Sequence, residues 1–226
     1  MNESILYMSN LASNLICDFC QEFSGQDTWL ARELVKIDLK NRILIRENGV
    51  VTLVGVGPLS PGYVLVLPVE HSYSISNCSL EQRMEIHSQK DKIATILRNE
   101  YGSVVCFEHG AVSSIKRGGA CVDHAHLHIL PGISGFRERL ATEFKEILIN
   151  NIGEIPSQTD INRPYLYLED KDGKCYVYQI PDVLPSQYIR RIWADIARMP
   201  DKWDWALFPN FPLMKETFLW FSSRIG

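Results

Sequence analysis

Three histidines at alternate positions are the residues of this chain best suited to chemistry. They are His124, His126 and His128, within the sequence DHAHLHILP of residues 123–131. We predict a β-strand over residues 121–130. Because successive side chains of a strand point to opposite faces, the three imidazoles would share one face and the apolar residues between them the other. An imidazole pKa lies near neutrality, so the row suits either metal binding or phosphate chemistry, and the spacing leaves both open.

The composition is that of an ordinary globular chain. It has 226 residues, of which 46% are hydrophobic and 22% charged, and its formal net charge is −4. This balance argues against an extended nucleic-acid-binding surface, although a small anionic ligand needs only local positive groups. No window approaches the roughly 18 consecutive apolar residues of a membrane span, so no membrane partner is expected.

The first sixteen residues lack the basic start and the uninterrupted apolar stretch of a signal peptide. We therefore expect a cytoplasmic protein. Its six cysteines are then expected to be reduced thiols, two of them in a metal site, rather than disulfides.

Hydrophobic patterning predicts an α+β fold with a mainly antiparallel sheet. Strands are expected over residues 41–68 (two strands), 103–108, 121–130, 164–169 and 175–180, and helices over residues 79–101, 137–151 and 185–198. Ser79, with Gln82 three positions on, has the spacing of an N-terminal capping box for the first of these helices. The sequence DKDGK, residues 170–174, predicts the turn of a hairpin.

A domain boundary is expected near residues 152–164, where Gly, Pro, Ser and Asn accumulate. We predict a catalytic domain over residues 1–152 and a carboxy-terminal extension, consisting of a hairpin and helices, over residues 153–226. The end of the extension is rich in aromatic residues and proline, so we expect it to pack onto the body of the protein rather than to hang free.

Three motifs together resemble the histidine triad (HIT) family. The first is the sequence His-Ala-His-Leu-His-Ile-Leu-Pro around His126. The second is a strand that runs into a proline and then a histidine at residues 62–71, and the third is the Cys-x-x-Cys of residues 17–20. The motifs occur in the family's order, and the resemblance covers about residues 17–131. It implies a HIT-like fold and a nucleotide hydrolase or transferase.

The resemblance assigns the chemistry to His126 and His128. It implies that His126 attacks the α-phosphorus of a nucleoside phosphate conjugate and forms a nucleotidyl-histidine intermediate, which water or another acceptor then resolves. It implies that His128 hydrogen-bonds the phosphate beside the nucleophile. The backbone carbonyl of a neighbouring triad residue would fix the tautomer of His126 and leave one ring nitrogen free to attack.

The same resemblance implies a structural Zn²⁺ held by Cys17, Cys20, His71 and His124, and no organic cofactor. Two cysteines and two histidines are a complete tetrahedral set without an open position for a substrate. The alternatives are a redox-active cysteine pair and two buried free cysteines. The chain lacks a βαβ context around Cys17, which weakens the redox interpretation.

The sequence departs from the family just before the triad. Many members have a glutamine there that contacts phosphate, whereas this chain has Gly-Ala-Cys-Val at residues 119–122. The candidates for replacement phosphate contacts are Lys116, Arg117, Gln187, Arg190 and Arg191. For each of them, a solvated surface side chain is the competing interpretation. His109 either lines the site or is a buried histidine of the core.

Two other functions remain open at this point. One is a metal-dependent hydrolase that uses the three triad histidines as ligands, and the other is a nucleotide-binding protein without catalysis. Metal content separates the first of these from a HIT enzyme, because one zinc retained together with Cys17 and Cys20 fits the structural site. The expected partner is a nucleotide substrate, and self-association as a homodimer is the second partner considered.

Overall fold

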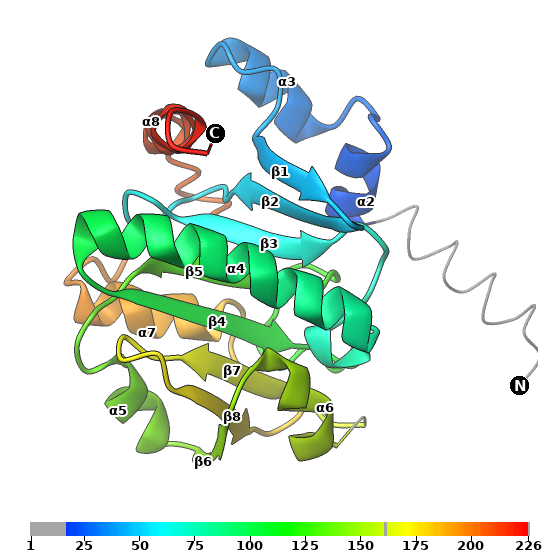
Figure 1. The fold of residues 1–226 in the computed structure, drawn as a ribbon, viewed down its shortest axis with the longest axis vertical. Helices are drawn as coiled ribbons and strands as arrows, with labels where there is room; N and C mark the ends of the chain where they lie inside the picture. Colours follow the sequence, from blue (N-terminus) through cyan, green and yellow to red (C-terminus); the bar gives the residue numbers. More distant parts are fainter. Residues whose placement is uncertain (1–16, 161, 226) are drawn as a thin grey trace, which may run out of the picture.

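One antiparallel sheet of eight strands forms the centre of the part of the chain that the computed structural model describes, residues 17–160 and 162–225 (Figure 1). The strand order is β1-β2-β3-β5-β4-β7-β8-β6, and every neighbouring pair is antiparallel. The strands are β1 (Ile43–Glu47), β2 (Val50–Val54), β3 (Val64–Pro68), β4 (Val104–Gly110), β5 (Leu127–Pro131), β6 (Lys145–Ile149), β7 (Tyr165–Glu169) and β8 (Cys175–Gln179). The predicted α+β fold with a mainly antiparallel sheet is confirmed.

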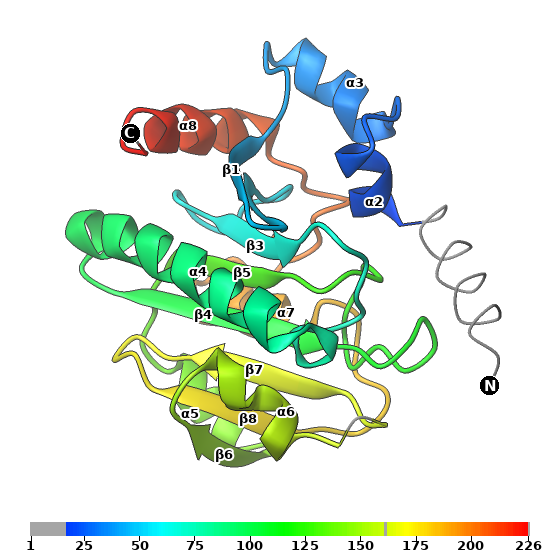
Figure 2. The ribbon, with the colours of Figure 1, turned by 45° about the vertical axis from the view of Figure 1, so that its right-hand side comes forward.

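Helices cover both faces of this sheet. They are α2 (Asp18–Phe23), α3 (Trp29–Lys36), α4 (Leu80–Tyr101), α5 (Phe136–Ala141), α6 (Ile155–Gln158), α7 (Tyr188–Ile196) and α8 (Phe211–Ser222), with two 3₁₀ turns, η1 (Ile75–Asn77) and η2 (Ile152–Glu154). The long helix α4 crosses one face of the sheet, and α7 lies on the opposite face (Figure 1 and Figure 2). Each face therefore has its own hydrophobic core.

Strand alternation divides the apolar residues between the two cores. In β2, Val50 and Val54 pack in the core on the α4 side, whereas Val51 and Leu53 pack in the core on the α7 side. All five positions of β2 and all five of β3 are buried, because both sides of these strands are covered.

The same alternation decides where His128 points. In β5, Leu127 and Ile129 belong to the core on the α4 side, and Leu130 belongs to the core on the α7 side. His128 lies between Leu127 and Ile129, so its ring is on the α7 side of the sheet. The chemistry-bearing face is thus the one covered by α7, from the carboxy-terminal part of the chain.

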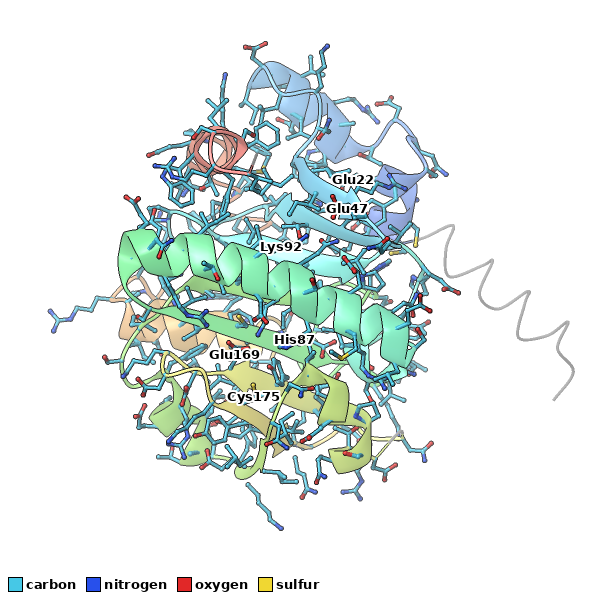
Figure 3. All side chains as sticks on the ribbon, viewed as in Figure 1. Glu22, Glu47, His87, Lys92, Glu169 and Cys175 are labelled. Atoms are coloured by element: carbon cyan, nitrogen blue, oxygen red, sulfur yellow. The ribbon has the colours of Figure 1, made fainter. Side chains whose placement is uncertain are left out.

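The predicted capping box of α4 is confirmed. Ser79 Oγ accepts a hydrogen bond from the Gln82 N–H at 3.1 Å, and Gln82 Oε1 accepts one from the Ser79 N–H at 3.0 Å. The helix is also tied to the sheet by charge, since Lys90 Nζ lies 2.6 Å from a carboxylate oxygen of Glu169 on β7. Glu169 lies directly below α4 in the view of Figure 3.

The prediction of two strands over residues 41–68 is wrong, because there are three. Asn48 and Gly49 turn the chain between β1 and β2, with φ angles of 48° and 73°. Two successive positive φ angles form the hairpin turn whose twist matches that of the flanking strands, and Asn-Gly is its preferred sequence. The turn signal was present in the sequence, but the continuous apolar run concealed it.

The predicted strand over residues 121–130 is too long. β5 begins only at Leu127, so His124 and His126 precede the strand and His128 lies in it. The neighbouring strand β3 ends at Pro68, and beyond it only one backbone bond continues the ladder, from the Ala125 N–H to the Ser72 carbonyl at 2.6 Å. Without a regular partner the segment cannot form ladder hydrogen bonds.

The predicted helix over residues 137–151 is also wrong in its second half. Helix α5 ends at Ala141, and residues 145–149 form β6, which pairs with β8 in the register Ile147↔Val177. Phe136 and Leu140, four residues apart, are buried on the helical part. The sequence KEILI that follows has only weak helical periodicity, and pairing with β8 decides its conformation.

The sheet continues through the predicted domain boundary at residues 152–164. β7 pairs with β4 and β8 pairs with both β7 and β6, although β6 precedes the boundary and β7 follows it. Near the end of the chain, α8 buries Met214 and Phe221 in the core on the α4 side. Among the described residues, no helix has the length and apolar character needed to cross a membrane.

Candidate active site

A cavity of about 310 Å³ lies beside the triad on the α7 side of the sheet. Its polar wall includes Tyr63, His109, His126, His128, Gln187 and Arg190. Its apolar wall includes Phe19, Trp29, Leu30, Val56 and Leu65. A concave site with one apolar side and a few convergent polar groups is the usual form of a small-molecule site. It is assembled from the amino-terminal helices, the sheet and the carboxy-terminal helix α7.

His126 is held so that one ring nitrogen is free. Its Nδ1 lies 2.6 Å from the backbone carbonyl oxygen of His124, which can only accept a hydrogen bond. Nδ1 therefore carries the proton, and Nε2 keeps a lone pair. Burial lowers the pKa of His126 to about 4, although the hydrogen bond to the carbonyl favours the charged form. The imidazole is neutral at neutral pH, which is the state a nucleophile requires.

His128 lies next to His126, with ring centroids 4.7 Å apart. Its Nδ1 is 2.5 Å from the Tyr63 hydroxyl, and its ring stacks on Phe107 at 4.3 Å. Burial lowers the pKa of His128 well below the ordinary value. Two neutral, adjacent imidazoles thus line the cavity.

A third histidine connects the cavity wall to α7. His109, at the end of β4, accepts a hydrogen bond at Nε2 from the backbone N–H of Ile189 at 3.0 Å. Burial lowers its pKa to about 3. Both sequence interpretations of His109 hold, because the residue lines the cavity and is also buried with a hydrogen-bond partner.

Another part of the cavity wall combines aromatic side chains with an ion pair. Phe19 lies 5.7 Å from His126 between ring centroids, and Trp29 is half exposed. Arg42, buried at the same end, donates two hydrogen bonds to the Glu22 carboxylate, at 2.9 and 2.6 Å. Since its charge is already paired, Arg42 brings little net positive potential to the cavity.

Four side chains outside the cavity converge as a metal site would require. They are Cys17, Cys20, His71 and His124, whose ligand atoms all lie within 4.8 Å of one another. The closest pairs are Cys17 Sγ with His124 Nδ1 at 3.3 Å and Cys20 Sγ with His71 Nδ1 at 3.5 Å. These distances match the edges of a zinc tetrahedron, about 3.3–3.8 Å for Zn–S and Zn–N bonds of about 2.3 and 2.0 Å.

The surroundings of this cluster also fit a metal. His124 Nε2 lies 2.9 Å from the Pro68 carbonyl oxygen, so Nε2 carries the proton and Nδ1 faces the cysteines with a lone pair. The hydrogen bond with Cys20 lowers the pKa of Cys17, which favours the thiolate that binds metals. The geometry brings together the four predicted ligands, and the donor set fits a structural zinc.

Most of the predicted phosphate-binding cations are placed elsewhere. Lys116 lies 3.5 Å from Asp182 and Arg117 lies 2.8 Å from Asp123, while Arg191 lies over the Trp203 ring. None of these three cations lines the cavity. Gln187 does line it, and its Nε2 donates to Asp204 at 3.3 Å.

Among the cavity-lining residues, the structure singles out Arg190 as the cation beside the triad and adds Tyr63, which the sequence analysis missed. Arg190 donates to the Tyr63 hydroxyl at 2.8 Å, although the two are 127 residues apart. No local pattern distinguishes a tyrosine at the start of an apolar strand from any other core tyrosine. Only its contact with His128 identifies it.

Comparison with curated proteins identifies distant relatives. CWF19-like protein 1 of Homo sapiens is 26% identical over 163 residues, which are 66% of this chain and 28% of that protein. Zinc finger CCCH domain-containing protein 59 of Oryza sativa subsp. japonica is 26% identical over 189 residues, which are 74% of this chain and 29% of that protein. The match thus covers less than a third of the length of either relative.

Solved structures of similar topology include a HIT family member from Bacillus subtilis, with a TM-score of 0.40 and 20% identity over 53% of this chain and 74% of that one. A zinc-bound histidine triad family protein from Mycobacterium smegmatis has a TM-score of 0.42 and 18% identity, covering 54% of this chain and 78% of that one.

The family model described as the HIT domain matches residues 37–135. The matched stretch contains β1 to β5, α4 and all three triad histidines. Cys17, Cys20 and α7 lie outside it. Over these residues, which are less than half of the chain, the protein is similar to the HIT domain.

Proposed function

We propose that the chain is a nucleotidyl hydrolase or transferase that acts on the α-phosphate of a nucleoside phosphate conjugate through His126. One observation carries the proposal. The His124 carbonyl holds the proton of His126 on Nδ1, and the neutral ring lines a cavity with Nε2 free. A neutral imidazole fixed in one tautomer beside a cavity is a competent nucleophile toward phosphorus.

The reaction would occur in two displacements. In the first, Nε2 of His126 forms a bond to the α-phosphorus and the bond from phosphorus to the leaving group breaks. The ring becomes cationic, and the His124 carbonyl, already within 2.6 Å of Nδ1–H, stabilises that charge. In the second, water or another acceptor attacks phosphorus, the N–P bond breaks, and neutral His126 returns as the nucleophile loses its proton to solvent or to a basic group.

The negative charge on the phosphoryl oxygens has to be met by donors in the cavity wall. Phosphoryl-type transfer depends mainly on positioning and electrostatic stabilisation. His128 lies beside His126, and Arg190 lies behind it with 2% of its surface exposed. We assign charge stabilisation to this pair, with Gln187 as a neutral polar contact in the same wall.

We further propose that Cys17, Cys20, His71 and His124 hold a structural Zn²⁺. The metal would join the start of the described chain to the segment that presents His126. His124 is two residues from His126 and its own carbonyl orients the nucleophile, so fixing the His124 side chain also fixes the carbonyl. The zinc would thereby stabilise the site without taking part in the chemistry.

The arrangement favours this function over a metal-dependent hydrolase built on the triad. In that alternative the three histidines would turn toward one ion. Instead, His124 Nδ1 faces the two cysteines, His126 Nδ1 is bonded to a carbonyl, and His128 Nδ1 is bonded to Tyr63. The remaining alternative, nucleotide binding without turnover, is decided by assay.

The test is turnover of a panel of adenosine and guanosine 5′-phosphate conjugates, namely polyphosphates, phosphoramidates and aryl esters. We expect His126→Ala to abolish turnover while nucleotide binding persists, and mass spectrometry of quenched wild-type reactions to find a nucleotidyl adduct on the peptide containing His126. His87→Ala is the matched control, because His87 lies on α4, its side chain is partly exposed, and it does not line the cavity. A His126→Ala enzyme that retains activity would refute the nucleophile assignment.

Self-association as a homodimer and a cytoplasmic location are further proposals. β4 is paired with β7 within the same chain, so the free sheet edges of the described residues are those of β1 and β6. A homodimer through the sheet would have to use one of them, which light scattering and substitution at the exposed Leu148 of β6 would detect. The cytoplasmic location is checked by cell fractionation.

A further inference from the structure

Arg190 of α7 lies in the active site, where the proposed function gives it one role, the stabilisation of negative charge on the phosphate. Its guanidinium is buried and forms three hydrogen bonds, each to a different segment. It donates to the Trp203 carbonyl at 2.8 Å, to the Gly57 carbonyl at 2.7 Å and to the Tyr63 hydroxyl at 2.8 Å. An arginine held at three points by oxygen acceptors is fixed in position, because its planar fork fits only one arrangement of acceptors.

The hydrogen bonds from Arg190 to Tyr63 and between Tyr63 and His128 determine the tautomer of His128. Arg190 can only donate, so the Tyr63 oxygen accepts its N–H and the Tyr63 proton must go elsewhere. Within the described residues, the one other polar contact of that hydroxyl is His128 Nδ1 at 2.5 Å. Burial raises the pKa of Tyr63, which keeps the phenol protonated. Tyr63 therefore donates to Nδ1, and His128 carries its proton on Nε2.

The opposite assignment leaves a buried group unsatisfied. If His128 donated from Nδ1, the Tyr63 oxygen would receive two donors and its own hydrogen would point at no acceptor. Tyr63 is 1% exposed, so water cannot supply one. The contact geometry thus selects a single proton arrangement over the alternative.

We propose that Arg190 and Tyr63 are positioning residues that lock His128 as the Nε2–H tautomer, so that it donates a hydrogen bond to a non-bridging oxygen of the substrate phosphate. This rests on the function proposed above. His126 and His128 then have opposite tautomers: one presents a lone pair to phosphorus and the other presents an N–H to its oxygen. The carboxy-terminal extension thereby supplies a part of the active site through α7.

The first test is spectroscopic and needs no substrate. In protein labelled with ¹⁵N-histidine, a bare ring nitrogen resonates well downfield of a protonated one. We expect wild-type His128, assigned by its loss in His128→Gln, to show a protonated Nε2 and a bare, hydrogen-bonded Nδ1. In Tyr63→Phe, which keeps the ring and removes only the hydroxyl, the lock should be lost and the two nitrogens should shift toward averaged values.

The second test measures whether His128 donates a hydrogen bond to the phosphate during turnover. The substrates are the p-nitrophenyl ester of adenosine 5′-phosphate and its two α-phosphorothioate diastereomers. Sulfur is a poor hydrogen-bond acceptor, so the wild type should discriminate against the diastereomer that places sulfur at His128. Tyr63→Phe should lower kcat on the oxygen ester by about ten- to a hundredfold, as expected for a lost hydrogen bond to a charged group, with KM nearly unchanged. It should also narrow the diastereomer preference.

Two further variants complete the design. Arg190→Lys keeps the charge but cannot reach three acceptors, so it should reproduce the effect of Tyr63→Phe, and the double variant should be no worse than either single one. Tyr188→Phe, which removes a hydroxyl from α7 outside the cavity, is the matched control and should leave tautomer and kinetics unchanged.

The outcomes separate this proposal from the function on which it rests. If Tyr63→Phe keeps the Nε2–H tautomer of His128 and the wild-type diastereomer preference, the positioning role is wrong even though the enzyme turns over. If the wild type turns over no nucleotide ester, the proposed function fails, and the nitrogen spectra alone confirm or overturn the lock.

Discussion

Glu108 should make the stability of this protein decrease as pH rises from 5 to 8. The residue lies on β4, is fully buried, and accepts hydrogen bonds from the Ile75 N–H at 2.7 Å and from the Tyr165 hydroxyl at 2.6 Å. Burial raises its pKa to about 7 from an ordinary 4.5, although both hydrogen bonds favour the charged form. The free energy lost by removing the carboxylate from water is larger than the free energy gained from its two hydrogen bonds.

The sign and size of the effect follow from linkage. Between pH 4.5 and 7 the folded state holds one more proton than the unfolded state at this group, so the free energy of unfolding falls by about 1.36 kcal/mol per pH unit. Titrating both states between pH 5 and pH 8 with the two pKa values gives a loss of about 2.5 kcal/mol. The stabilisation is complete below pH 4.5 and is lost as pH rises through 7.

The assay is urea unfolding at several pH values for the wild type and Glu108→Gln. Glutamine can still accept from Ile75, but it leaves the Tyr165 hydroxyl without an acceptor, so the variant should be less stable at pH 5. The difference between the two proteins should shift by about 2.5 kcal/mol in favour of the variant on going to pH 8. Glu81→Gln, exposed on the first turn of α4, should follow the wild type. A difference that stays constant with pH would refute the reasoning.

Three other predictions concern the metal and the active site. Elemental analysis should find about one zinc per chain, and Cys20→Ser should lose both the metal and several degrees of Tm. Cys106→Ser, at a buried position outside the cluster, is the control and should keep the zinc. A stable, metal-free wild type would contradict this prediction. Because burial holds the pKa of His126 at about 4, kcat/KM should stay level from pH 8 down to pH 5 and fall only below that, and a fall centred near pH 6.5 would show that the ring is not buried during catalysis. Trp29→Ala, at the aromatic edge of the cavity, should raise KM by about tenfold and leave kcat within about twofold, because loss of uniform binding changes KM alone; a fall in kcat of the same size would place Trp29 in the chemistry instead.

The alternate spacing of the three histidines predicted their relationship better than it predicted their secondary structure. Only His128 lies in β5, yet His126 remains within 4.7 Å of it and Phe19 contacts the rings of both His124 and His126. The chain bends at residues 121–124, and the Ala125 N–H then bonds to the Ser72 carbonyl where the regular ladder has ended. Side-chain alternation needs only an extended backbone, whereas strand assignment needs a paired one.

The cavity wall contributed by α7 was beyond sequence reasoning for a different reason. Lys116, Arg117 and Arg191 were reasonable candidates because each is a cation near the triad or on a helix with a polar face. The local sequence does not indicate which of the cations is buried. In the structure these three pair with surface partners, whereas Arg190 is buried. That choice is made by tertiary contacts between segments more than a hundred residues apart.

The segment just before the triad, residues 119–122, lacks the phosphate-contacting glutamine expected from the resemblance to the HIT family, and α7 packs against it. The loop that would have carried it is closed by this helix: the Gln187 N–H donates to the Gly119 carbonyl at 2.7 Å, and Gly119, with φ at +89°, has the Tyr188 Cβ about 3.1 Å from where its own Cβ would be. A loop packed this closely has little room to aim a long amide at the substrate. The polar groups next to the triad come instead from Arg190, acting through Tyr63, and from Gln187 itself. The close packing of residues 119–122 and the polar groups that α7 adds beside the triad therefore have one structural origin, the contact between this helix and the loop.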